Sequence, residues 1–390
     1  MIGYSRLLHS ITLQNLLSYG PDSAPLDLRA LNVLIGPNAS GKSNLVEALD
    51  LLRAAPKDLA GFIREGGGVG EWLWKGTPKV PTATIDVVVA YPAGQDALRH
   101  RLAFTASGPR LEVTDEAVED AAASQLPSAQ DDFYYRYRQG RPQLRTRRLA
   151  ERSNQHAGAL QEAGQDYWFV RELRREDLAP DQSVLSQRRD PDQYPELAYL
   201  GDHYTQFRLY REWNLGRVTP LRLPQKPDLP TDFLLEDASN LGLVLNDLEH
   251  RAGMRSLLLE KLREFYAPVT DISTKIASGT VQVFLHERGL REPVPATRLS
   301  DGTLRYLCLL AILCHPAPPP LIAIEEPELG LHPDILPTIA NLLVEASQRT
   351  QLVVTTHADG LVDSLTATPD AVIVCEKKRG YDDHAAAGDR

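Results

Sequence analysis

A glycine-rich loop between an apolar run and a helical pattern constrains the fold of this chain more than any other feature. Residues 31–35 are apolar except for one asparagine, and Gly36–Ser43 follows directly with the spacing G-x-x-x-x-G-K-S. After the loop and before Pro56, apolar residues recur at helical spacing, at Leu45, Ala48, Leu49 and Leu52. In a strand–loop–helix unit, backbone N–H groups of such a loop wrap phosphates, and the helix adds the positive end of its dipole. The context favours a nucleotide-binding α/β sheet over a chance glycine turn.

The loop and the start of the following helix therefore supply the candidate nucleotide ligands. These residues are Gly36, Pro37, Asn38, Ala39, Ser40, Gly41, Lys42, Ser43 and Asn44. Lys42 is expected to reach the β- and γ-phosphates of ATP, and the Ser43 hydroxyl is expected to coordinate Mg²⁺.

Two adjacent glutamates end a second apolar run at residues 321–324. Both carboxylates should emerge at the carboxyl edge of the sheet, where ligands bind in open α/β folds. Glu325 is expected to hold Mg²⁺ through water, and Glu326 to orient and deprotonate the attacking water. The alternative is a pair of solvated acids at the end of a strand.

Two later motifs fit the same nucleotide. His357 follows the apolar run 352–356, where it is expected to contact the γ-phosphate and respond to its loss, unless it merely caps the strand. Leu299–Thr303, with the sequence L-S-D-G-T, precedes a helical pattern that starts at Leu304. A serine and free N–H groups at a helix start form a second phosphate site, although the same pattern also describes an ordinary N-cap.

The order of these motifs resembles that of the ABC-type ATPases, and within them the RecF/SMC/OLD-like branch. Residues 324–333 are similar to the I-E-E-P-E-x-G-L-H-P motif of that branch, and residues 299–303 to its L-S-D-G-T signature. Transporter ATPases usually carry aspartate in place of Glu325 and glycine in place of Asp301, and both differences are normal for this branch. The resemblance covers mostly residues 5–56 and 295–376 and is weak between them.

The resemblance implies an α/β fold, the P-loop NTPase fold of the ABC-type head, with a mixed central sheet, an antiparallel β lobe and an inserted helical lobe. It also implies a head-to-tail homodimer that forms on ATP binding. The ATP held by one copy would be covered by Ser300, Asp301 and Gly302 of the other. Glu326 would be the general base and His357 the switch histidine, with Lys42 completing the catalytic set.

Four units are expected along the chain. Residues 1–60 and 291–390 form the two parts of the ATPase core, residues 61–120 the antiparallel β lobe, and residues 121–290 the partly helical inserted lobe. Between residues 120 and 235 the many prolines and charges leave no clear element pattern. No sustained heptads occur, which excludes long SMC-type arms. Too few residues follow His357 for the Toprim domain of OLD nucleases, so we expect a stand-alone ATPase.

Two details of the nucleotide site stay open. Gln130 and Gln139 are the candidates for the Q-loop glutamine of the family, and neither is assigned. Tyr19 either stacks on the adenine, as an aromatic residue does in many ABC ATPases, or packs within its turn.

Composition limits the location and the partners of the protein. The 390 residues are 43% hydrophobic and 24% charged, and no apolar run approaches the roughly 18 residues that span a bilayer. The first residues lack a signal-peptide pattern. Cys308, Cys314 and Cys375 lie in apolar stretches, which is typical of reduced core cysteines. We therefore expect a cytoplasmic protein that does not act at a membrane.

One basic segment stands out against the net charge of −10. Tyrosines and arginines interleave after Phe133, and such residues can contact phosphates and stack on bases. The candidate DNA contacts are Arg136, Arg138, Arg141, Arg145, Arg147 and Arg148. The alternative is a β-hairpin that turns at Gly140, with arginines on its wet face and tyrosines packed. The acidic balance favours action with a partner, such as a separate nuclease subunit.

Together these patterns predict a slow, Mg²⁺-dependent ATPase that acts as a dimeric switch in DNA repair, recombination or antiphage defence. Two other classes remain as alternatives: the energy-coupling subunit of a membrane transporter, and a scaffold that binds ATP without cleaving it. The Glu325 pattern and the large middle insertion argue against the transporter subunit. Intact Lys42, Glu326 and His357 argue against the scaffold.

Overall fold

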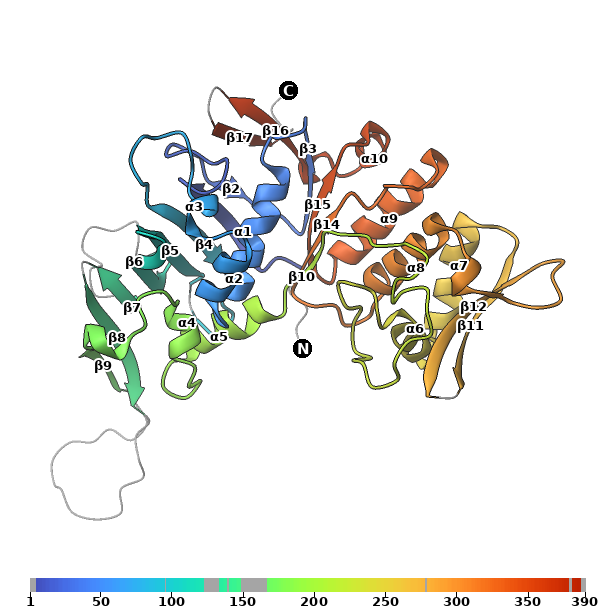
Figure 1. Cartoon of the computed structure of the whole chain (residues 1–390), viewed down its shortest axis with the longest axis horizontal. Coiled ribbons are helices and arrows are strands. Elements are labelled where there is room, and N and C mark those ends of the chain that lie inside the picture. The colour runs from blue at the N-terminus through green and yellow to red at the C-terminus, as the bar shows by residue number, and fades with distance from the viewer. Residues whose placement is uncertain are drawn as a thin grey trace, which may run out of the picture.

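The computed structural model describes residues 5–94, 96–122, 133–138, 140–148, 167–277, 279–378 and 381–386. In Figure 1 an antiparallel sheet occupies one side of the molecule and a helical region the other, and a second sheet runs between them. The blue N-terminal strand β3 lies beside the orange-red C-terminal strands, so the two ends of the chain build the middle of the molecule together (Figure 1).

The central sheet is mixed, as the sequence predicts. Within the described residues its order is β10 (Arg208–Tyr210), β14 (Leu321–Glu325), β15 (Gln351–Thr356), β3 (Leu31–Ile35), β16 (Val372–Lys378) and β17 (Tyr381–Ala386). Every pair is parallel except β16 with β17, which is antiparallel. The carboxyl ends of β3, β14 and β15 therefore meet at one edge.

Both faces of this sheet are buried, which explains its continuous apolar runs. Successive side chains of a strand point to opposite faces. On β3, Leu34 packs in one hydrophobic cluster with Leu49, and its neighbour Val33 packs in another with Leu310. Each fully buried leucine stabilises the fold by roughly 1.5–3 kcal/mol. A strand that is buried on both faces cannot alternate apolar and polar residues, and this explains the pattern of β3, β14 and β15.

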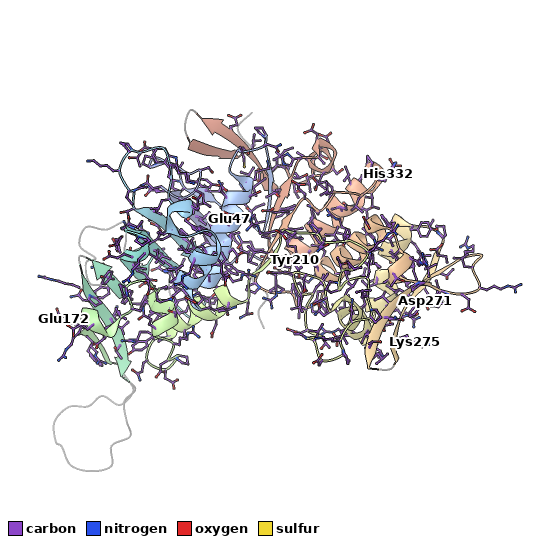
Figure 2. All side chains as sticks on the ribbon, viewed as in Figure 1. Glu47, Glu172, Tyr210, Asp271, Lys275 and His332 are labelled. Carbon is purple, nitrogen blue, oxygen red and sulfur yellow. The ribbon has the colours of Figure 1, made fainter. Side chains whose placement is uncertain are left out.

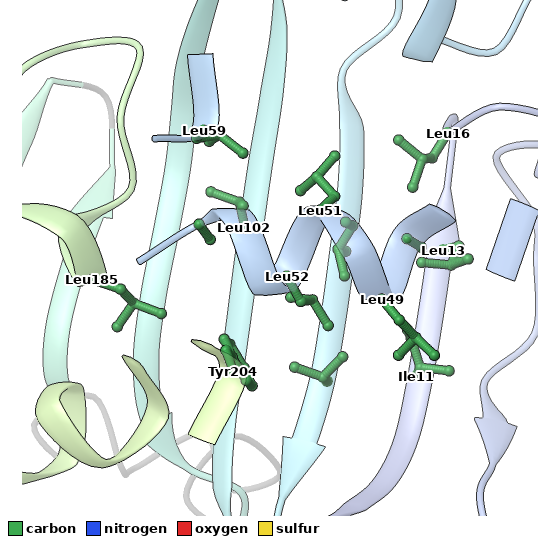
Figure 3. Close-up of a cluster of buried hydrophobic side chains, with 14 of the residues drawn as sticks. Ile11, Leu13, Leu16, Leu49, Leu51, Leu52, Leu59, Leu102, Leu185 and Tyr204 are labelled. Carbon is green, nitrogen blue, oxygen red and sulfur yellow. The ribbon is translucent and has the colours of Figure 1, made fainter. Parts of the chain in front are cut away.

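The antiparallel sheet contains both expected and unexpected strands. Among the described residues its order is β2 (Leu26–Asp27), β1 (Leu8–Gln14), β4 (Ala83–Val89), β5 (Leu98–Ser107), β6 (Arg110–Asp120), β7 (Phe133–Arg138), β8 (Arg141–Arg148) and β9 (Tyr167–Glu172). The sheet therefore contains strands on both sides of the segment 61–120. Helix α1 (Lys42–Ala54) packs over it: in Figure 3, Leu49 and Leu52 of α1 lie against strands that carry Ile11 and Leu102.

The remaining helices cover the edges and the far face. Helices α2 (Leu59–Glu65), α3 (Val69–Trp72), α4 (Val184–Gln187) and α5 (Pro195–Thr205) border the antiparallel sheet. Helices α8 (Asp301–Leu313), α9 (Leu336–Ser347) and α10 (Asp359–Asp363) cover the face of the central sheet opposite α1. Helices α6 (Leu241–His250) and α7 (Met254–Phe265) pack beside α8, together with the three-stranded sheet β11 (Val269–Ala277), β12 (Thr280–Glu287) and β13 (Val294–Pro295). In the part of the chain that the structure describes, no helix is both long and apolar enough to cross a bilayer.

Strand β10 was not predicted. It has three residues, and it joins the central sheet beside β14 from within the segment where the sequence shows no clear pattern. Three residues are too few for a periodic signal, and the strand is defined by its long-range pairing with β14 instead.

Candidate functional site

The glycine-rich loop connects β3 to α1 through a backbone path that few residues can follow. A Cβ on Gly36 would lie 2.2 Å from the carbonyl oxygen of Cys375, so no side chain fits there. Gly41 has φ 94° and Ala39 has φ 62°, both in the left-handed region. Because L-residues other than glycine enter this region at a cost, the glycines of the motif are required by the turn itself.

Lys42 folds back across the loop from the first turn of α1. Its Nζ donates hydrogen bonds to the carbonyl oxygens of Gly36, at 2.7 Å, and Pro37, at 3.1 Å. Burial lowers the pKa of Lys42, and the nearby Glu326 carboxylate opposes that shift. The ammonium group is thus held at the loop by neutral carbonyls, and an anion there would be a stronger partner for it.

Other loop groups also fit a phosphate. Helix α1 begins without a side-chain cap, which leaves backbone N–H groups at its N-terminus. The buried Ser40 hydroxyl has no hydrogen-bond partner among the described residues. Ser43 is exposed, whereas the side chain of Asn44 donates a hydrogen bond to Ser18 Oγ at 2.5 Å and so anchors the helix start.

Tyr19 contacts this loop through its side-chain hydroxyl. Its hydroxyl donates a hydrogen bond to the carbonyl oxygen of Gly41 at 3.1 Å, and only 2% of the residue is exposed. A ring buried in this way has no open face for an adenine, so the packed alternative for Tyr19 is correct.

Glu325 ends β14 among charged and polar neighbours. Arg211 follows β10; its Nε lies 3.6 Å from Glu325 Oε1, and one of its terminal nitrogens lies 2.9 Å from Glu47 Oε1. Figure 2 shows Glu47 on α1 and Tyr210, the neighbour of Arg211, near the middle of the molecule. Burial raises the pKa of Glu325, while Arg211 and the Ser43 hydroxyl act in the opposite direction.

Ser43 and Glu325 fit Mg²⁺, which prefers oxygen ligands and is usually bound through one or two protein groups plus phosphates. No cluster of three or more histidines, cysteines or acids that could hold a metal occurs in the described ranges, so a cage made of protein ligands alone is not present there. A pocket of about 660 Å³ is lined by Arg211 and by acids that include Glu47, Asp50, Glu236 and Glu325. So many acids disfavour a bare triphosphate inside this pocket, whereas Glu325 also reaches the phosphate loop through Ser43.

Glu326 has a strained backbone that turns the chain away from the strand. Its φ of 47° is in the left-handed region, and its N–H donates to the carbonyl oxygen of Thr355 at 2.9 Å. Arg305 of α8 donates to the carbonyl oxygen of Glu326 at 2.9 Å. The carboxylate lies 3.6 Å from His357 Nε2, and both side chains are 40% exposed. Strain of this kind costs about 1–3 kcal/mol and is concentrated at functional sites.

Glu328 is a site residue to which the sequence analysis gave no role. Its Oε1 accepts hydrogen bonds from Thr356 Oγ1, at 2.6 Å, and from the His357 N–H, at 3.1 Å. The residue therefore joins the loop after β14 to the end of β15 and fixes the backbone of His357. Its position after the paired glutamates was visible in the sequence, but its partners lie 28 and 29 residues away.

The signature segment lies on the other face of the central sheet. Ser300 caps α8, since its Oγ accepts a hydrogen bond from the Thr303 N–H at 3.0 Å. Asp301 forms an ion pair with Arg222, and a Cβ on Gly302 would lie 3.0 Å from the carbonyl oxygen of Gly330. Helices α1 and α8 pack in different clusters on opposite faces, so the signature segment and the phosphate loop of one chain do not share a face.

The structure thus brings one subset of the predicted residues together. Lys42, Ser43, Glu325, Glu326 and His357 converge at the carboxyl ends of β3, β14 and β15. Ser300, Asp301 and Gly302 lie at the start of α8, which packs in the cluster on the other face of the sheet. Gln130 and Gln139, the Q-loop candidates, lie outside the described residues.

The basic segment forms the β-hairpin that the sequence analysis gives as the alternative to a DNA contact. Strands β7 and β8 pair in antiparallel fashion around Gly140, which has φ 78°, and Tyr135 and Tyr137 are buried. The guanidinium group of Arg136 lies over the Phe133 ring and 3.6 Å from Glu119, with 17% of its side chain exposed. Arg136 is therefore engaged within the sheet. Arg141 is exposed and Arg145 half-buried, whereas the side chains of Arg138, Arg147 and Arg148 lie outside the described part.

The cysteines agree with the sequence analysis. Cys308, Cys314 and Cys375 are buried and form no disulfide, and burial raises the pKa of Cys308 to about 12 and of Cys314 to about 11. Protonated, buried thiols of this kind are core residues.

Two solved structures with this architecture are head domains of SMC proteins. One is an SMC head bound to the C-terminal winged-helix domain of ScpA, with 12% identity and a TM-score of 0.55 over 97% of both chains. The other is an SMC head with an extended coiled coil, bound to the C-terminal domain of ScpA from Pyrococcus furiosus. It has 11% identity and a TM-score of 0.50 over 97% of this chain and 96% of that one. At this identity the likeness establishes the fold, an α/β P-loop ATPase fold of the SMC/ABC type.

Sequence comparison gives the family. None of the curated proteins matches the chain. A family model described as "AAA domain, putative AbiEii toxin, Type IV TA system" matches residues 31–363, which include the phosphate loop, the paired glutamates and the histidine. The chain therefore belongs to this family of P-loop ATPase domains.

Proposed function

We propose that this protein binds ATP with Mg²⁺ and hydrolyses it at the interface of a head-to-tail dimer. The observation that carries the proposal is the convergence of Lys42, Glu325, Glu326 and His357 at one edge of the central sheet. A strained, half-exposed carboxylate beside a histidine and a buried lysine is an arrangement suited to phosphoryl transfer to water.

Each residue has a distinct task in this proposal. The loop N–H groups and Lys42 bind the phosphates, and Ser43 and Glu325 hold Mg²⁺, which supplies positive charge against the triphosphate. Glu326 orients and deprotonates the attacking water. His357 contacts the γ-phosphate, and Glu328 keeps the histidine in place through its backbone N–H.

In the proposed dimer, the second copy supplies the groups that cover the ATP bound to the first copy. Ser300 and Gly302 stand at the exposed N-terminus of α8, where N–H groups and a hydroxyl favour an anion. Since this segment lies across the sheet from its own phosphate loop, we propose that it covers the ATP of a sister molecule.

Phosphate release tests the activity and the dimer together. A Lys42→Ala chain keeps an intact signature, and a Ser300→Asp chain keeps an intact phosphate loop. Each alone should be inactive, whereas a mixture should regain hydrolysis, because one composite site of each mixed dimer is complete. Wild-type protein that releases no phosphate at any concentration would favour the ATP-binding scaffold instead.

We further propose that the ATPase cycle serves as a cytoplasmic switch in DNA repair, recombination or antiphage defence, together with DNA or a nuclease subunit. The net charge of −10 favours a DNA contact confined to one small surface. Its candidates are the other arginines of the β7–β8 hairpin, Arg138, Arg141, Arg145, Arg147 and Arg148. Changing Arg145, Arg147 and Arg148 to alanine should flatten the salt dependence of DNA binding, by about one unit of log–log slope for each phosphate that the variant no longer neutralises. An unchanged slope would remove the hairpin from the proposal.

A further inference from the structure

One buried arginine outside the described motifs contacts the signature segment at several points. Arg222 follows β10 in sequence, and only 7% of its side chain is exposed. Its Nε donates to the carbonyl oxygen of Leu215 at 2.8 Å, and its Nη1 to those of Leu299, at 2.5 Å, and Ala296, at 3.4 Å. Its Nη2 donates to Asp301 Oδ1. The planar fork thus bonds to the backbone on the N-terminal side of Ser300 and to the acid that follows it.

Asp301 poses an electrostatic problem for the proposed dimer. Its side chain is 70% exposed, and it stands between Ser300 and Gly302, the residues proposed to cover a triphosphate. A carboxylate several ångströms from phosphate oxygens repels them, by about 1–4 kcal/mol per charge pair near a protein surface. An unpaired acid at this position would therefore oppose ATP-dependent closure.

We infer that Arg222 is a positioning residue that neutralises Asp301 and holds the signature backbone so that the segment can accept the triphosphate of a sister molecule. The inference rests on the proposed function and deepens it. Nearly complete burial of Arg222 holds its guanidinium against the inner side of the Asp301 carboxylate, whose other side is exposed. The acid then serves to fix the helix start, and its charge is compensated at the surface that meets the nucleotide.

The charge and the hydrogen bonds of Arg222 can be separated by substitution. Arg222→Gln keeps an N–H donor for the backbone carbonyls but removes the charge, and Arg222→Lys keeps the charge but removes the fork. Asp301→Asn removes the acid that the charge compensates. All variants are placed in a Glu326→Gln background, and the MgATP concentration that gives half-maximal dimer is measured by light scattering.

Arg222→Gln should raise this midpoint at least about tenfold, which corresponds to one uncompensated charge near the triphosphate. Arg222→Lys should stay within about threefold of the parent, and adding Asp301→Asn to Arg222→Gln should restore the midpoint to the same range. Arg251→Met is the matched control, since Arg251 pairs with Asp247 on α6, away from the signature segment, and it should leave the midpoint unchanged.

The outcomes separate the inference from the function on which it rests. If the double variant is as impaired as Arg222→Gln, Arg222 acts only as a backbone clamp and the inference is overturned. If Arg222→Gln does not fold, Arg222→Lys still decides, because a tenfold loss there would show that charge alone is insufficient. A parent protein that stays monomeric with MgATP would overturn the proposed function, and the inference with it.

Discussion

The carboxyl edge of the central sheet and the signature segment use their polar groups in opposite ways. At the edge, polar groups bond to one another: Lys42 to loop carbonyls, and Glu328 to Thr356 and to the backbone of His357. In the signature segment, Ser300 and Asp301 are exposed: Ser300 bonds to Thr303 within the same turn, and Asp301 pairs with the buried Arg222. Contacts within one chain thus hold the polar groups of the carboxyl edge in place, whereas the polar groups of the signature segment are exposed at the surface.

Among substitutions at the carboxyl edge, Glu326→Gln should have the largest effect. Removing a general base that activates water should lower phosphate release by about a thousandfold, while ATP binding and dimer formation survive. Phosphate release and nucleotide binding measured on the same preparation check this. A variant that hydrolyses ATP at the rate of the wild type would exclude Glu326 as the base.

Lys42→Ala, at the same edge, should impair the binding of ATP. Loss of a charged hydrogen-bonding group to the phosphates should weaken ATP binding by about a hundredfold. Calorimetric titration measures this, and Lys57→Ala, which changes a lysine just beyond α1, should bind ATP normally. Equal affinities for the two variants would contradict the role of Lys42.

The signature segment can be altered without disturbing its own chain. Ser300→Asp keeps a good N-cap for α8, so the free energy of unfolding should change by less than about 0.5 kcal/mol. The added charge should nevertheless raise the MgATP midpoint for dimer formation at least about tenfold. Ser300→Ala provides the contrast, since loss of the cap should cost about 1 kcal/mol of stability. If Ser300→Asp dimerises normally, the segment does not meet a triphosphate.

The smallest effect is expected from removing the hydrogen bond between Thr356 and Glu328. Thr356→Val removes the hydroxyl that donates to Glu328, and it leaves the half-buried Glu328 carboxylate without one partner. Stability should fall by about 1–3 kcal/mol in chemical denaturation, and hydrolysis should fall with it as His357 loses its fixed position. Thr356→Ser keeps the hydroxyl and should behave like the wild type. Identical stability of the two variants would argue against this link.

Much of the edge was predictable because its signals are local. The apolar runs that became β3, β14 and β15 each lead directly into Gly36, Glu325 and His357, so strand ends and chemistry coincide in the sequence. The parallel order of the sheet then brings those ends together. The helix after the glycine-rich loop and the helix predicted to start at Leu304 likewise follow from helical spacing.

The features that sequence reasoning missed depend on distant partners. Strand β10 is only three residues long and is defined by pairing with β14, more than a hundred residues later. Arg211 and Arg222 lie in a stretch rich in charges and prolines, where nothing local marks one arginine as buried. Their partners, Glu325 and Asp301, were recognised from the sequence, but an ion pair leaves no pattern along the chain.

The central claim is that ATP joins two copies through the signature segment, and light scattering of the Glu326→Gln protein tests it most directly. With MgATP the molar mass should double relative to the sample with ADP, and adding Ser300→Asp should return it to that of a single chain. A monomer under every condition would contradict the claim. So would a dimer that the Ser300→Asp change leaves intact.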